Sequence, residues 1–204
     1  MGDPRRVRPD EVEIVIAREL RKAGLALSIV RVLSRRALAP EDPSEYAMEL
    51  AGLTPTSTAS GATPRDVLID FRNEVRVTDV DAVRALEARA APVTPTAAAD
   101  GPKRLQPVAQ PTERPPDVAP SSPPLRVMVS TAGFDVTAAR EAVTLGMVLL
   151  RLADGGAAFL RSQWAMGDQP PAWVPEYMAE LVDLGPTGDV RYQLITGELK
   201  ILSR

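Results

Sequence analysis

Residues 126–152 read RVMVSTAGFDVTAAREAVTLGMVLLRL. The first apolar run predicts a strand that ends in a turn of small residues. The Ala-rich stretch that follows predicts a helix, with Asp135 or Thr137 near its start and Gly146 at its end. Residues 147–153 predict a second buried strand. A strand-helix-strand unit of this length is typical of two neighbouring parallel strands, and so of an α/β fold.

A second strand-helix unit lies upstream, at residues 66–88, which read DVLIDFRNEVRVTDVDAVRALEA. Its apolar residues alternate with a polar set that contains Asp70 and Arg72, as expected of a strand with one polar face. Asp79 and Asp81 lie in the first turn of the helix predicted after this strand, where the helix dipole favours negative charge.

The N-terminal region predicts a helix and two extended segments. Apolar residues recur every three or four positions over residues 10–23, which indicates an amphipathic helix with Gly24 after its end. Residues 25–33 predict a strand. Residues 45–53 predict another, although SEYAMELAGL also fits a helix.

Proline divides the chain. Ten of its twenty prolines fall in residues 92–125, with few large apolar side chains, which predicts a disordered or polyproline-like linker. We expect residues 1–91 and 126–154 to be two parts of one core, although the chain length also fits two very small domains. Residues 155–204 are expected to be an accessory region, with a short helix at 171–185 and a hairpin that turns at Thr196 and Gly197.

Composition excludes several classes of chemistry. The 204 residues include no histidine and no cysteine, which removes Cys/His zinc sites, disulfides, thiol catalysis and Ser-His or Cys-His pairs. The net charge of −3 means that contact with nucleic acid would require a local basic patch. No apolar run is long enough to span a bilayer and the basic N-terminus lacks a signal-like apolar stretch, so we expect a cytoplasmic protein without a membrane partner.

Three strings, in this order, resemble Mrr-like type IV restriction endonuclease domains: EVEIVIARELRKAGL at 11–25, the segment at 66–88 and the segment at 126–152. The resemblance implies a restriction-endonuclease-like core, a mixed central sheet flanked by helices, which the proline-rich linker interrupts. It also implies Mg²⁺-dependent hydrolysis of DNA. Glu13 stands at the acidic position that the family has in its first helix.

The resemblance further implies two carboxylates that hold the cation beside a lysine. The third-strand acid would be Asp70, and the second-strand acid would be Glu45 or Glu49. Arg72 stands where the family has lysine; it stays protonated, and its planar fork does not replace a compact ammonium beside a water molecule. We therefore expect a degenerate or weakly active site, with Mg²⁺ only if it is active. From the residues alone, Asp70 and Arg72 also fit a charge pair on the polar face of a half-exposed strand.

Partners follow from the same comparison. DNA is the expected partner, and a basic cluster could contact its phosphates. The cluster consists of Arg5, Arg6, Arg8, Arg35 and Arg36. The alternative function is a non-catalytic interaction scaffold that captures a protein partner through the proline-rich linker.

Overall fold

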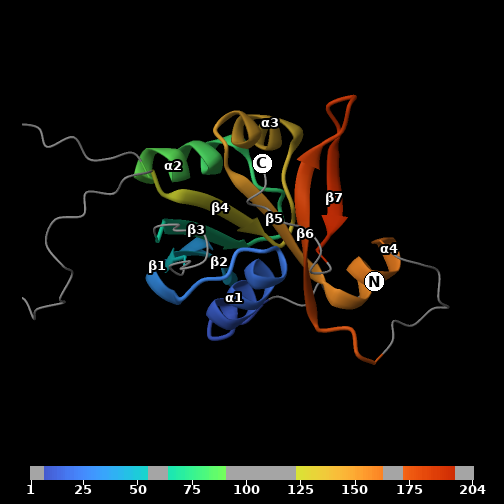
Figure 1. Cartoon of the computed structure of the whole chain (residues 1–204), viewed down its shortest axis with the longest axis horizontal. Coiled ribbons are helices and arrows are strands. Elements are labelled where there is room, and N and C mark those ends of the chain that lie inside the picture. Colours follow the sequence, from blue (N-terminus) through green and yellow to red (C-terminus); the bar gives the residue numbers. More distant parts are fainter. Residues whose placement is uncertain (1–6, 55–63, 91–122, 163–171, 196–204) are drawn as a thin grey trace, which may run out of the picture.

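The computed structural model describes residues 7–54, 64–90, 123–162 and 172–195. Over these residues the chain is an α/β protein with a seven-stranded mixed sheet and four helices (Figure 1). The helices are α1 (Val12–Lys22), α2 (Val80–Ala90), α3 (Val136–Thr144) and α4 (Gly155–Ser162). The strands are β1 (Ile29–Ala39), β2 (Asp42–Leu53), β3 (Asp66–Asn73), β4 (Leu125–Ser130), β5 (Val148–Asp154), β6 (Tyr177–Leu184) and β7 (Val190–Leu194).

The strands lie in the sheet in the order in which they occur along the chain. β1, β2 and β3 form an antiparallel meander, β3, β4 and β5 are parallel, and β6 and β7 continue antiparallel. The parallel pair β4–β5 confirms the strand-helix-strand unit predicted at 126–152. Pairing of β3 with β4 joins the segments before and after residues 91–122 in one sheet.

Helices cover both faces of the sheet (Figure 1). α1 packs on one face, where the β3 side chains Ile69 and Phe71 belong to its core. α2 and α3 pack together on the other face, over a smaller core that includes Met128 and Leu149. Because side chains alternate along a strand, Asp70 points to the face of α2 and α3.

The first five predicted elements are present with shifted boundaries. The helix predicted at 10–23 is α1, and the strand predicted at 25–33 begins later, as β1. The ambiguous segment at 45–53 is strand β2 rather than a helix. Its pairing on both sides, with β1 and with β3, explains why sheet structure prevails over the helical pattern there.

The predicted C-terminal elements are partly wrong. Residues 177–184 of the helix predicted at 171–185 are instead β6, a buried strand that pairs with β5 and β7. β6 and β7 form a hairpin that turns at residues 185–189, where the Gly185 N–H donates to the Asp189 carbonyl. The predicted turn at Thr196 and Gly197 lies outside the described residues. Helix α4 was not predicted; Asp154 caps it by accepting from the Ala157 N–H at 3.0 Å.

Most of the predicted linker, residues 91–122, also lies outside the described part of the chain. Its proposed disorder therefore stays a prediction. No helix among the described residues has the length and apolar character needed to cross a membrane.

Candidate functional site

Two carboxylates face each other on adjacent strands. In the antiparallel register Glu49 of β2 is the direct partner of Asp70 of β3. Directly opposed residues point to the same face of a sheet, with their Cβ atoms roughly 5 Å apart. The register therefore brings together one second-strand acid and the third-strand acid.

Asp70 is almost completely buried, with a side chain only 1 % exposed. Arg89 of α2 donates from Nη2 to Asp70 Oδ2 at 2.9 Å. Arg36 of β1 adds a second cation, with Nη2 at 3.6 Å from the same oxygen. The other oxygen, Oδ1, has no hydrogen-bond partner among the described residues.

Glu49 shares one of these arginines. Its Oε2 lies 3.9 Å from Arg89 Nε and accepts from the Ser34 hydroxyl at 3.5 Å. Arg89 occupies the last turn of α2, where a cation also interacts favourably with the helix dipole. Its guanidinium group therefore lies close to both carboxylates.

Arg72 projects from β3 on the same face as Asp70, two positions further along. Its Nε lies 3.3 Å from Glu74 Oε1. The Thr131 hydroxyl holds the adjoining backbone, since it accepts from the Glu74 N–H at 3.1 Å. Arg72 thus forms an ion pair beyond the end of β3. It does not supply the compact ammonium group that the nuclease comparison implies next to the two acids.

Burial controls the ionisation of both acids on β3 and its C-terminal turn. It raises the pKa of Asp70, and attraction to Arg89, Arg36 and Arg72 only partly opposes that rise. Burial likewise raises the pKa of Glu74, against a hydrogen bond from Thr78 and attraction to Arg72. The ionised form of Asp70 therefore depends on its arginine neighbours.

The structure separates the remaining acidic candidates from this pair. The β2–β3 register begins at Tyr46, so Glu45 lies beyond it and about 13 Å along the strand from Glu49. Glu13 belongs to α1, which packs on the opposite face from α2. Its Oε1 accepts from the Val32 N–H at 3.2 Å, so Glu13 bonds the β1 backbone and does not contact Asp70.

The basic candidates also separate. Arg5 and Arg6 lie outside the described residues. Arg8 pairs with Glu11 and lies 4.0 Å from Asp10. Arg35 stacks on a tyrosine ring of β2, at 4.9 Å from its centroid, and Arg36 reaches Asp70.

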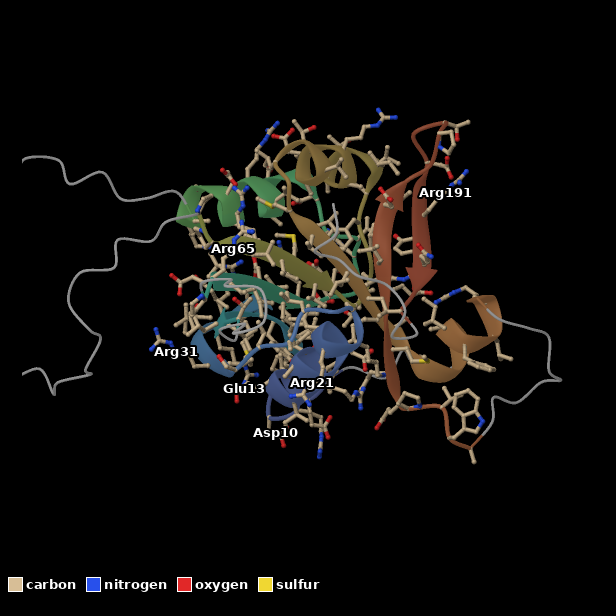
Figure 2. All side chains as sticks on the ribbon, in the orientation of Figure 1. Asp10, Glu13, Arg21, Arg31, Arg65 and Arg191 are labelled. Carbon is tan, nitrogen blue, oxygen red and sulfur yellow. The ribbon has the colours of Figure 1, made fainter. Side chains whose placement is uncertain are left out.

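The strand β1 carries a third, unanticipated arginine. Arg31 is exposed and points outward from the edge of the sheet (Figure 2). Together, Arg31, Arg35 and Arg36 give β1 three positive charges and no negative charge. We call these three residues the β1 arginines.

A search of protein-family models, of curated proteins and of solved structures found no match to the chain. The site must therefore be interpreted from its own geometry.

The residues present do not fit a resident Mg²⁺ ion. Two carboxylates can suffice for Mg²⁺ when water completes its octahedral shell. Here both carboxylates already lie beside guanidinium groups, and a divalent cation would meet Arg89 and Arg36 at close range. Among the described residues no group of three or more Asp, Glu, His or Cys side chains could hold a metal ion.

Arg89 is the site residue that sequence reasoning missed. In the sequence it is one of several charges on an amphipathic helix, with nothing to distinguish it. Its role depends on how α2 crosses the sheet, and no local pattern specifies that direction.

Proposed function

We propose that this chain is a DNA-binding protein with a restriction-endonuclease-like fold, in which phosphodiester hydrolysis is impaired or absent. The observation that carries the proposal is the position of Arg89, which donates to Asp70 and approaches Glu49, the two acids that hydrolysis would need for a cation.

The order of elements supports the fold assignment. A helix, an antiparallel three-stranded meander, a crossover helix and a strand parallel to the third follow one another from α1 to β4. This is the order that the resemblance implies. The acidic pair lies on the second and third of these strands, as the resemblance also implies.

Impaired hydrolysis follows from the cations around the acids. A metal-dependent nuclease uses its cation to polarise the phosphate and to lower the pKa of the attacking water. A guanidinium group can neutralise carboxylates, but it stays protonated and supplies no activated water. Arg72 also lacks the geometry of the missing lysine.

DNA binding is proposed through the β1 arginines. The chain is net negative, so attraction to phosphate needs a local surface of positive charge. The edge strand β1 carries three arginines and no acid, and lies next to the acidic pair. Arg36 projects to the face of that pair, 3.6 Å from Asp70, and Arg35 projects to the other face.

The test combines binding and cleavage on the full chain. Fluorescence anisotropy with a labelled DNA duplex measures binding, and relaxation of supercoiled plasmid in Mg²⁺ or Mn²⁺ measures cleavage. We expect wild type and Asp70→Ala to bind DNA at low salt, and wild type to nick plasmid weakly or only at the background level that Asp70→Ala gives. Efficient nicking by wild type that Asp70→Ala abolishes would show an active nuclease, and no DNA binding at low salt would refute the proposal.

A further inference from the structure

Arg89 lies beside two carboxylates, those of Glu49 and Asp70. Opposed acids of this kind can bind a divalent cation when no positive side chain lies between them. We infer that Arg89 is an internal counter-ion that takes the position of a divalent cation between Glu49 and Asp70, and that removing its charge opens a cation site there.

The contacts single out Arg89 among the nearby cations. Its Nη2 lies 2.9 Å from Asp70 and its Nε lies 3.9 Å from Glu49. Arg36 approaches Asp70 alone, from an exposed position on the edge strand. Arg72 is paired with Glu74. Arg89 therefore lies between the acids: it donates a hydrogen bond to Asp70, and its Nε, which has no hydrogen-bond partner among the described residues, is within ion-pair distance of Glu49.

Burial explains why the position must be filled by a charge. A carboxylate as buried as Asp70 is costly to leave without a counter-charge. Its Oδ1 also lacks a hydrogen-bond partner among the described residues, so one buried oxygen is free to accept another ligand. Without the Arg89 charge, Arg36 still lies beside Asp70 Oδ2, but no guanidinium group lies between the two acids. The opposed carboxylates then present the oxygen-rich donor set that hard divalent cations prefer, with water completing the shell.

The inference deepens the proposed function, since it names the group that replaces the metal. The inference is tested independently of the DNA-binding proposal, because metal binding is measured without DNA. Loss of DNA binding would leave it untouched, and absence of metal binding would leave the DNA proposal untouched.

The experiment titrates Mn²⁺ into the full chain and follows free Mn²⁺ by electron paramagnetic resonance. We expect Arg89→Gln to bind one Mn²⁺ about tenfold or more tighter than wild type, because a neighbouring positive charge is gone. Adding Asp70→Asn to Arg89→Gln should abolish that binding. Arg84→Gln is the matched control, since Arg84 lies on the same helix but pairs with Glu141, and it should behave as wild type.

Two results would overturn the inference: equal Mn²⁺ affinity in Arg89→Gln and wild type, or tight binding that survives Asp70→Asn. Arg89→Gln could also lose its fold. In that case the variant is refolded with Mn²⁺ and with Na⁺. Recovery of cooperative unfolding with Mn²⁺ alone supports the cation site, and failure to recover contradicts it.

Discussion

Glu49 and Asp70 lie directly opposite each other on β2 and β3, and both lie beside the guanidinium group of Arg89. The two acids come from neighbouring strands of the meander, whereas the arginine comes from a helix that crosses the same face. Their meeting therefore depends on the complete fold of this half of the sheet. The same arrangement explains both the burial of Asp70 and the poor fit of a metal ion beside it.

The raised pKa of Asp70 makes stability depend on pH. An acid whose pKa is higher in the folded than in the unfolded state binds more protons when folded, so stability falls as pH rises from its ordinary value, 3.8, through the raised value. Glu74 contributes in the same direction. As pH rises over this range, we expect the unfolding free energy of wild type to fall relative to that of Asp70→Asn, because asparagine does not titrate. Urea unfolding at several pH values measures it, and a difference that stays constant would contradict the raised pKa.

Arg31 provides the cleanest test of the DNA surface, because it is exposed and points outward from the edge of the sheet. We expect Arg31→Ala to weaken DNA binding and to reduce the slope of log affinity against log salt by about 1, as loss of one phosphate contact does. Arg191→Ala is the control, since Arg191 lies on β7 at the far end of the sheet from β1 (Figure 2). Equal slopes of log affinity against log salt for the two variants would show that Arg31 of β1 does not contact DNA phosphates.

The elements that the sequence predicted well have strong local patterns. The 126–152 unit combines a buried strand, an Ala-rich helix and a closing Gly, and each signal agrees with the others. Of the two residues expected near the start of α3, Asp135 is the cap, and it accepts from the Ala138 N–H at 2.6 Å. Local chemistry was sufficient for this part of the fold.

The C-terminal strand β6 could not be predicted in the same way. Its sequence, YMAELVDL, is apolar on both faces, which resembles a helix when no strand partners are known. β6 pairs with β5 and with β7, and strand pairing is a tertiary property that a local sequence pattern does not reveal. The buried charge of Glu180, which pairs with Arg151 and with Arg161 of α4 at 3.0 Å, was equally hidden.

For the site, spacing predicted Asp70 and Arg72 on one face but could not choose between Glu45 and Glu49. The choice depends on the β2–β3 register, and a shift of four residues would have exchanged them. The arginine partners of Asp70 come from β1 and α2, so only the assembled sheet identifies them.

A buried carboxylate on the other face of the sheet should contribute to stability. Glu19 of α1 accepts from the Ala179 N–H of β6 at 3.2 Å and from Lys22 at 2.9 Å. We expect Glu19→Ala to lower the unfolding free energy by about 3 kcal/mol, because it leaves a buried donor unsatisfied. Urea unfolding measures the loss, and amide exchange at Ala179 should accelerate.

Glu141→Ala is the comparison for Glu19→Ala, since Glu141 forms a more exposed ion pair with Arg84 at 3.2 Å. Such pairs contribute roughly 0 to 1 kcal/mol. Equal losses from the two substitutions would mean that the Glu19 contacts do not hold β6 against α1.

Substitution of two glycines by alanine separates the stability cost of a positive φ angle from the cost of a steric clash. Gly133 and Gly146 both have positive φ, at 92° and 65°. A Cβ at Gly146 would have no neighbour within 4 Å, whereas at Gly133 it would lie 2.6 Å from the Tyr192 hydroxyl oxygen. We expect Gly146→Ala to cost about 1 kcal/mol from backbone strain, and Gly133→Ala to cost about 1–3 kcal/mol more from the clash. Tyr192→Phe should restore part of the additional loss in a double-mutant cycle. Equal losses at the two glycines would show that the turn after β4 does not pack against β7.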